Sequence, residues 1–251
     1  MTKNPQKFIT TFKKELPKIL GDLVVGIYLC GSLTYDAFDP QRSDVDIVVV
    51  LTRNLNDKEF KKLKRWYESL QKRYKHWGEN SEIDFVPQRK LISDGRELDK
   101  MTRLYGGKTL RRGFAHGSNP VTWVNITKTG VTLYGELPKK LVPHIPKRYI
   151  LNALQSELRH FQKKSKIWSK SDLFSQSYAI LTMCRIFYTH KKGELVSKKK
   201  AARWCQHKVP QKFAKAIRIA ADSLKNLDAP PREELQEAYV PFLKFVKSKV
   251  E

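Results

Sequence analysis

The N-terminal half of the chain contains three short apolar runs that predict β-strands. These are "LVVGIYLC" at 23–30, "VDIVVVL" at 45–51 and "SEIDFVP" at 81–87. Proline removes a backbone donor, so Pro87 is expected to end the third strand.

Two amphipathic stretches alternate with these strands. Residues 5–20 have helical spacing, with Asn4 and Pro5 as a start signal. Residues 57–74 place their apolar side chains on one face of a helix. That predicted apolar stripe comprises Phe60, Leu63, Tyr67 and Leu70.

Residues 94–146 have no sustained period. Glycines, prolines and single aromatic residues dominate, and only "VTLYGE" at 131–136 predicts a short strand. Prolines at 138, 143 and 146 then indicate a linker.

After this linker every segment has helical spacing. Ser197 is a good N-cap for one helix, and Pro230–Pro231 is a start signal for the last. The predicted helices are 147–169, 173–191, 198–208, 210–226 and 231–249. We therefore expect an α+β domain with a mixed sheet and flanking helices at 1–146, followed by an all-α helical bundle at 147–251.

Charge leaves two interpretations open. The chain has 49 Lys and Arg against 25 Asp and Glu, a net charge of +24, and each of the two predicted domains carries about half of it. Either the lysines cover solvated helix faces, or the protein has affinity for a polyanion such as nucleotide or RNA.

The composition indicates the expected cellular location of the protein. No apolar run approaches the ~20 residues of a membrane helix, and the N-terminal segment has no continuous apolar core of a signal peptide. Cys30, Cys184 and Cys205 are scattered, which is typical of free thiols in a reducing compartment. The expected location is the cytoplasm, with no membrane partner. The histidines show no zinc-ligand spacing.

Candidate chemistry lies in "YLCGSLTYDAFDPQRSDVDIVVVL", residues 28–51. Side chains alternate along a strand, so Asp44 and Asp46 point to the same side. Two neighbouring carboxylates repel unless a cation lies between them, and Mg²⁺ prefers oxygen ligands. Gly31 allows backbone to approach a phosphate, and Ser32 offers a hydroxyl.

The glycine–serine turn and the acid pair of this stretch together suit one ligand. "LTYDAF" at 33–38 can start a helix whose free N–H groups face an anion. We therefore expect a metal-bound nucleoside triphosphate, while a P-loop is excluded because its motif is absent. The alternative is a turn glycine followed by a solvent-facing acid pair.

"GS" followed after eleven residues by "DVD" resembles the DNA polymerase β-like nucleotidyltransferase superfamily. The resemblance implies transfer of a nucleotide to a hydroxyl with Mg²⁺ held by three carboxylates. The third would come from the strand at 81–87, which offers Glu82 and Asp84 on one face. Glu82 is the first choice and Asp84 the second.

Further segments resemble one branch of that superfamily. "NPVTWVNITKTGVTLYGELP" and "LTMCRIFYTHKKGELVSKKKAARW" are similar to streptomycin and spectinomycin adenylyltransferases. This similarity implies that Lys198 contacts the ATP phosphates across a domain cleft and that Arg185 lines the same cleft. A lysine in the first turn of a helix is also disfavoured by the helix dipole, which is an independent hint of a ligand. The alternative is one more solvated lysine.

The loop "IWSKSDLFSQSY" departs from the streptomycin-modifying relatives. Trp168 and Asp172 match their drug-contacting residues, whereas Ser175 stands where those enzymes have an acid. The resemblance thus implies AMP transfer from ATP to an aminoglycoside or aminocyclitol. Alternatives are a nucleotidyltransferase acting on RNA or protein, and an inactive RNA- or ribosome-binding protein on this fold.

Overall fold

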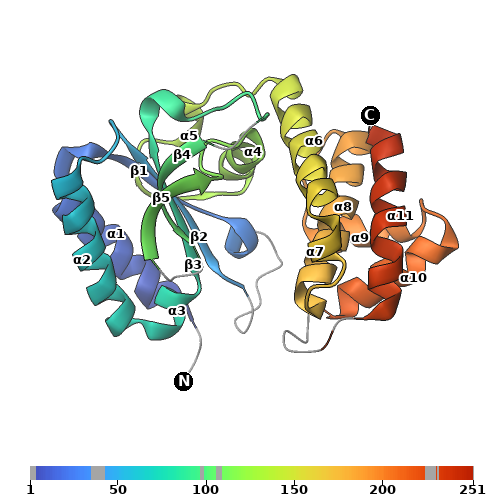
Figure 1. The fold of residues 1–251 in the computed structure, drawn as a ribbon. Coiled ribbons are helices and arrows are strands. Elements are labelled where there is room, and N and C mark those ends of the chain that lie inside the picture. The colour runs from blue at the N-terminus through green and yellow to red at the C-terminus, as the bar shows by residue number, and fades with distance from the viewer. Residues whose placement is uncertain are drawn as a thin grey trace. The chain divides into compact units, whose positions relative to one another are not determined.

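The computed structural model describes residues 4–34, 43–96, 99–105, 109–223, 230 and 232–250. Contacts divide the chain into two compact units, Met1–Ile150 and Leu151–Glu251, coloured blue to light green and yellow to red in Figure 1. The domain boundary expected at 146 stays a prediction.

The first unit is built on a six-stranded mixed sheet with the order β5-β4-β3-β2-β1-β6. Strands β2 and β3 are parallel, and the other neighbouring pairs are antiparallel. The strands are β1 (Val24–Cys30), β2 (Val45–Leu51), β3 (Ser81–Pro87), β4 (Asp99–Tyr105), β5 (Thr109–Ala115) and β6 (Val131–Gly135). The predicted strands are confirmed, and the three long apolar runs are neighbours in the sheet.

Helices cover both faces of this sheet (Figure 1). On one face, α1 (Gln6–Leu20) and α2 (Asp57–Arg73) pack their apolar stripes against side chains such as Ile27, Val49 and Phe85. On the other face, α4 (Pro120–Lys128) contributes Trp123 to a smaller core with Tyr28. The short elements are η1 (Gly21–Leu23), η2 (Gly31–Thr34), α3 (Lys75–Glu79), η3 (Gln88–Lys90) and α5 (Pro138–Leu141).

Residues 94–146 are more regular than the sequence pattern predicts. Strands β4 and β5 and helix α4 all lie in this segment. Strand β4 has no apolar run, because Lys100 and Arg103 interrupt it. Arg103 is nevertheless buried, with 7% of its surface exposed, and its carboxylate partners come from β3. The burial of β4 therefore depends partly on a tertiary ion pair, which an apolar sequence pattern does not reveal.

The second unit consists of helices, as expected. Its helices are α6 (Lys147–Lys163), α7 (Ser165–Trp168), α8 (Leu173–Lys192), α9 (Lys198–Gln206), α10 (Gln211–Ser223) and α11 (Glu233–Val250). The buried helix α8 packs against α9, α10 and α11, so it forms the centre of the bundle. The helix predicted at 147–169 is interrupted at Lys164, which corrects that prediction.

Local signals in this unit are confirmed where the structure describes them. The Ser197 hydroxyl accepts a hydrogen bond from the Lys200 amide, which caps α9. Pro231 and residues 224–226 lie outside the described residues.

All three cysteines are buried free thiols. Within the described ranges, no helix combines the length and apolar character that a bilayer crossing requires.

Candidate active site

Gly31 and Asp46 lie in contact at the end of β1 and the start of β2. Gly31 has a φ of +71°, which side chains other than glycine rarely adopt. A β-carbon at this position would lie 1.8 Å from Asp46 Oδ2. The glycine therefore meets two requirements, a left-handed backbone and room for the carboxylate.

Strand register brings the predicted acids together. Asp46 pairs with Cys30 on β1 and with Glu82 on β3, so these side chains share one face of the sheet. Asp44 lies two residues before Asp46. Burial, followed by the negative charges of Asp46, Asp84, Asp44 and Glu82, raises the pKa of the Cys30 thiol well above its usual value. All four carboxylates thus lie near enough to the Cys30 thiol to act on it electrostatically.

Glu82 and Asp84 have different surroundings. The Glu82 side chain is 31% exposed, whereas the Asp84 side chain is 11% exposed. The backbone amides of His116 and Gly117 donate hydrogen bonds to Asp84. Burial raises the pKa of Asp84, and the charges of Arg103 and His116 oppose that rise. Only Glu82 of these two has substantial access to a ligand.

Arg103 links the two acids from the neighbouring strand. Its guanidinium lies 3.7 Å from Glu82 Oε2 and 3.6 Å from Asp84 Oδ1. It also donates a hydrogen bond to the Phe114 carbonyl of β5. Since its side chain is only 8% exposed, Arg103 has a fixed position from which to orient Glu82. The sequence interpretation missed this residue, although the Gly-Gly pair at 106–107 between two strand-length segments is a hairpin signal.

The residues present suit a divalent cation and phosphates by donor type. Three carboxylates supply the hard oxygen ligands that Mg²⁺ prefers. The Ser32 hydroxyl is buried and has no hydrogen-bond partner among the described residues. A buried hydroxyl without a partner costs free energy that a ligand oxygen would recover. Over the described ranges, no three His, Cys, Asp or Glu side chains are arranged closely enough to hold a metal ion.

The helix start proposed after Ser32 is only partly described. Residues Gly31–Thr34 form the 3₁₀ turn η2, in which the Thr34 hydroxyl donates to the Gly31 carbonyl at 2.9 Å. Residues 35–42 lie outside the described residues.

In the second unit, Lys198 and Trp168 both contact the ring of Tyr178. The Lys198 ammonium is 3.5 Å from the centroid of the Tyr178 ring. The Trp168 ring stacks on Tyr178 with centroids 6.1 Å apart and planes inclined by 20°. Arg185 follows Tyr178 by seven residues, so both project from the same face of α8. The structure thereby brings two residues that the sequence singled out, Lys198 and Trp168, onto a tyrosine that it did not, with Arg185 two turns further along α8.

Asp172 and Ser175 bind each other at the start of α8. The Asp172 carboxylate accepts hydrogen bonds from the Ser175 amide at 2.9 Å and from its hydroxyl at 2.7 Å. Burial by itself would raise the pKa of Asp172, but the hydrogen bonds from Ser175, together with those from the Asp172 and Phe174 amides, lower it. This pair is an N-cap, and it also fixes the position of both side chains in the loop after Trp168.

Comparison with known proteins divides the chain in the same way as its architecture. Residues 9–113 match the nucleotidyltransferase domain, and residues 140–249 match the aminoglycoside adenylyltransferase C-terminal domain. The chain therefore combines a nucleotidyltransferase domain with an aminoglycoside adenylyltransferase C-terminal domain. The family resemblance seen in the sequence is therefore confirmed, and so is the assignment of the chain as an enzyme.

Individual relatives of this nucleotidyltransferase cover nearly its whole length. The spectinomycin 9-adenylyltransferase of Campylobacter jejuni is 23% identical over 93% of this chain and 90% of that protein. The spectinomycin 9-adenylyltransferase of Staphylococcus aureus strain N315 is also 23% identical, over 99% of this chain and 96% of that protein.

A solved structure has the same fold. The crystal structure of the spectinomycin adenyltransferase AAD(9) from Enterococcus faecialis, with ATP and spectinomycin, matches with a TM-score of 0.74 and 18% identity. The match covers 98% of this chain and 99% of that one. The predicted fold class, an α+β nucleotidyltransferase domain followed by a helical bundle, is confirmed.

Proposed function

We propose that this enzyme transfers AMP from ATP to a hydroxyl of an aminocyclitol antibiotic, with spectinomycin preferred to streptomycin. The observation that carries the proposal is the contact between Gly31 and Asp46 beside Glu82. It combines a glycine turn with paired carboxylates, which is the arrangement needed for a metal-bound nucleotide. The acceptor is inferred from the relatives, which are spectinomycin adenylyltransferases.

Asp44, Asp46 and Glu82 are the proposed holders of Mg²⁺. When bound, the cation neutralises charge on the phosphates and polarises the α-phosphoryl group. The three carboxylates would repel one another in its absence, so ATP with Mg²⁺ should stabilise the folded protein.

Glu82 has a second proposed role as general base. In the transfer, the acceptor oxygen bonds to the α-phosphorus, the bond to the pyrophosphate oxygen breaks, and Glu82 takes the hydroxyl proton. Arg103 orients the Glu82 carboxylate from β4. Asp84 holds Arg103 in turn, which gives the buried acid a supporting role.

The remaining predicted residues bind the two substrates. Gly31 and Ser32 hold the outer phosphates through close backbone and a free hydroxyl. Arg185 and Lys198 supply positive charge for the phosphates. Tyr178 positions Lys198 through its ring.

Trp168, Asp172 and Ser175 form the proposed contact with the acceptor. Trp168 offers an aromatic surface and Asp172 a carboxylate for a cationic amine. The three buried free thiols support a reducing cytoplasmic setting.

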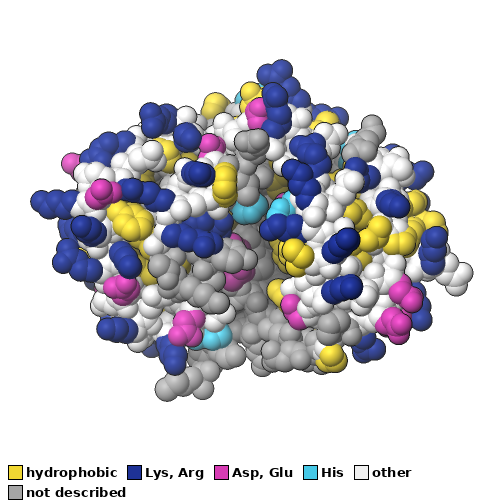
Figure 2. Space-filling model, in the orientation of Figure 1, with side chains coloured by type: hydrophobic (Ala, Val, Ile, Leu, Met, Phe, Trp, Pro, Cys, Tyr) yellow, Lys and Arg dark blue, Asp and Glu magenta, His cyan; other side chains and the backbone are white. Residues whose placement is uncertain are grey.

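A nucleotidyltransferase acting on RNA or a protein is the second candidate, and the net charge of +24 favours the RNA acceptor. Lys and Arg side chains are spread over both units on the face shown in Figure 2. Incubation of the pure protein with α-labelled ATP, Mg²⁺ and separate panels of aminoglycosides, RNAs and proteins separates the candidates. Label on spectinomycin supports the proposal, and label on RNA or protein alone replaces it.

A further inference from the structure

A stretch of positive charge without acids covers α9, the turn after it and α10 as far as Ala221, and Asp222 follows it directly. Residues 195–221 contain no Asp or Glu. In contrast, α2 mixes its lysines with Asp57, Glu59 and Glu68. The basic residues of the stretch are Lys198, Lys199, Lys200, Arg203, Lys208, Lys212, Lys215 and Arg218.

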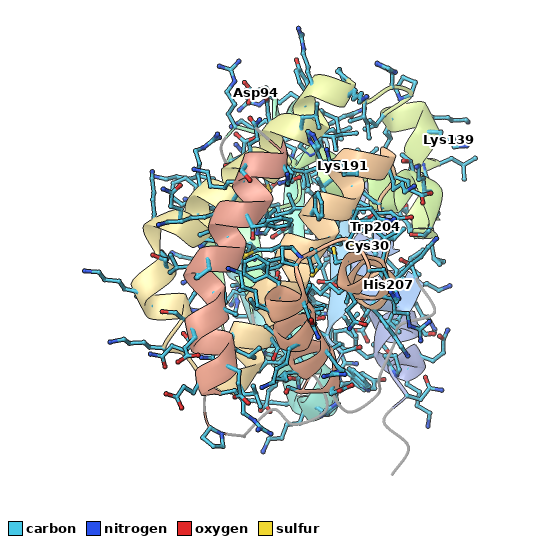
Figure 3. The ribbon with its side chains drawn as sticks, turned by 90° about the vertical axis from the view of Figure 1, so that its right-hand side faces the viewer. Cys30, Asp94, Lys139, Lys191, Trp204 and His207 are labelled. Carbon is cyan, nitrogen blue, oxygen red and sulfur yellow. The ribbon has the colours of Figure 1, made fainter. Side chains whose placement is uncertain are left out.

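Part of this stretch lines a groove. The groove starts at the end of α9, beside His207, whose position Figure 3 shows. Its volume is about 470 Å³, and it is open to solvent. The lining residues are Gln206, Gln211, Lys212, Ala214, Lys215 and Arg218. We call this feature the α10 groove.

The cations of the α10 groove outnumber the single acid of α10, Asp222, which lies one helical turn after Arg218. Lys212, Lys215 and Arg218 are exposed, and none forms an ion pair with a carboxylate of the described residues. They recur every third residue, so they lie near one another on α10 and repel. A bound polyanion would remove this repulsion.

The other lining residues indicate which polyanion the groove suits. Among the described lining residues Ala214 alone is apolar, so these residues include neither the apolar side chains that enter a membrane nor the aromatic anchors typical of protein interfaces. The nearby Trp204 is partly exposed, packs on Phe187 and Tyr188, and is not among the lining residues of the groove. Gln206 and Gln211 offer amide groups that suit ribose 2′-hydroxyls.

We propose that the α10 groove binds the sugar–phosphate backbone of double-stranded RNA. A rise of ~1.5 Å per residue puts roughly 9 Å between Lys212 and Arg218, the length of a few phosphates along one strand. This binding site is separate from the transfer reaction and needs neither ATP nor the antibiotic.

The test uses a triple variant, Lys212→Gln/Lys215→Gln/Arg218→Gln, in the full chain. Fluorescence anisotropy with a 20-base-pair RNA duplex gives the affinity at several salt concentrations. We expect binding to weaken at least tenfold and the slope of log affinity against log salt to fall by about 2–3. AMP transfer should be unchanged, which also shows that the variant folds.

A matched control removes the same charge from α2. Lys58, Lys61 and Arg65 are exposed, and the control variant is Lys58→Gln/Lys61→Gln/Arg65→Gln. We expect it to bind the duplex within threefold of the wild type. Equal weakening in both variants would show that only net charge acts and would overturn the proposal. Equal affinity for a DNA duplex of the same sequence would overturn the assignment to RNA.

Discussion

A β-carbon on Gly31 would lie 1.8 Å from Oδ2 of Asp46. The carboxylate therefore occupies the space that any other residue at position 31 would fill. Gly31→Ala should displace the Asp46 side chain from its position beside Glu82. We expect at least a 10²-fold loss of AMP transfer, since misplacement of about 1 Å at a reacting centre has effects of that size.

Gly21 is the matched control for this substitution. It has a φ of +58°, and a β-carbon there would meet nothing within 4 Å. Gly21→Ala also carries backbone strain, because its φ is positive. Thermal unfolding should show that both variants are destabilised, while only Gly31→Ala loses activity. Comparable activity in the two variants would contradict the role of this contact.

The two acids of β3 should respond differently to neutral substitutions. Glu82→Gln should keep ATP affinity within a few fold and lower the rate by roughly 10²–10⁴, the range for loss of a general base. Asp84→Asn should instead lower stability, because Arg103 is left buried with one charged partner fewer. Single-turnover rates and urea unfolding measure the two effects. A nearly normal Glu82→Gln beside an inactive but stable Asp84→Asn would reverse the assignment.

The apolar pattern predicted the three long strands of the sheet that position the acids. Alternation along the strands placed Asp44 and Asp46 on one side and Glu82 and Asp84 on one face, whereas the resemblance implied a third acid and favoured Glu82. The pattern could not predict Arg103, because its burial depends on carboxylates from another strand. Tyr178 was missed for a similar reason, since its contacts with Trp168 and Lys198 join three helices. Ion pairs and ring contacts between residues that are far apart in the chain produce no periodic pattern in the sequence.

The loop between α7 and α8 should determine which antibiotic is used. Streptomycin carries two guanidinium groups, and Ser175 leaves one charged hydrogen bond unmade. Such a bond contributes roughly 1.5–3 kcal/mol, or about 10- to 150-fold in affinity. Ser175→Asp should improve kcat/KM for streptomycin by a factor in this range and leave spectinomycin little changed.

Ser175→Asn tests whether the effect of Ser175→Asp comes from the negative charge or from the size of the new side chain. It adds a side chain of similar shape without the negative charge, so it should not improve streptomycin use. An unmodified enzyme that uses streptomycin at least as well as spectinomycin would contradict the account of this loop.

Glu15 should make stability depend on acid pH. The bidentate hydrogen bonds from Arg73, at 2.7 and 2.6 Å, are the main cause that lowers the pKa of Glu15 to about 2. Because the folded pKa lies below the usual value of 4.5, this contribution is complete above pH 4.5 and is lost as pH falls toward 2. Urea unfolding at pH 6.5 and pH 3 should show a smaller loss of stability for Glu15→Gln than for the wild type.

A surface pair provides the comparison for Glu15. Glu68 lies 4.0 Å from Lys64 on the exposed face of α2. For Glu68→Gln, the loss of stability between pH 6.5 and pH 3 should be the same as in the wild type. If Glu15→Gln also leaves it unchanged, the ion pair with Arg73 does not contribute to acid stability.

The central claim is that Asp46 and its neighbours carry AMP transfer to spectinomycin. The most direct measurement is the mass of spectinomycin after incubation with ATP, Mg²⁺ and either the wild type or Asp46→Asn. Asp46→Asn should keep its melting temperature, because removing one of several neighbouring carboxylates relieves repulsion. The account predicts a spectinomycin–AMP adduct with the wild type and none with the folded variant. Unmodified spectinomycin with the wild type, or equal adduct formation by both proteins, would contradict it.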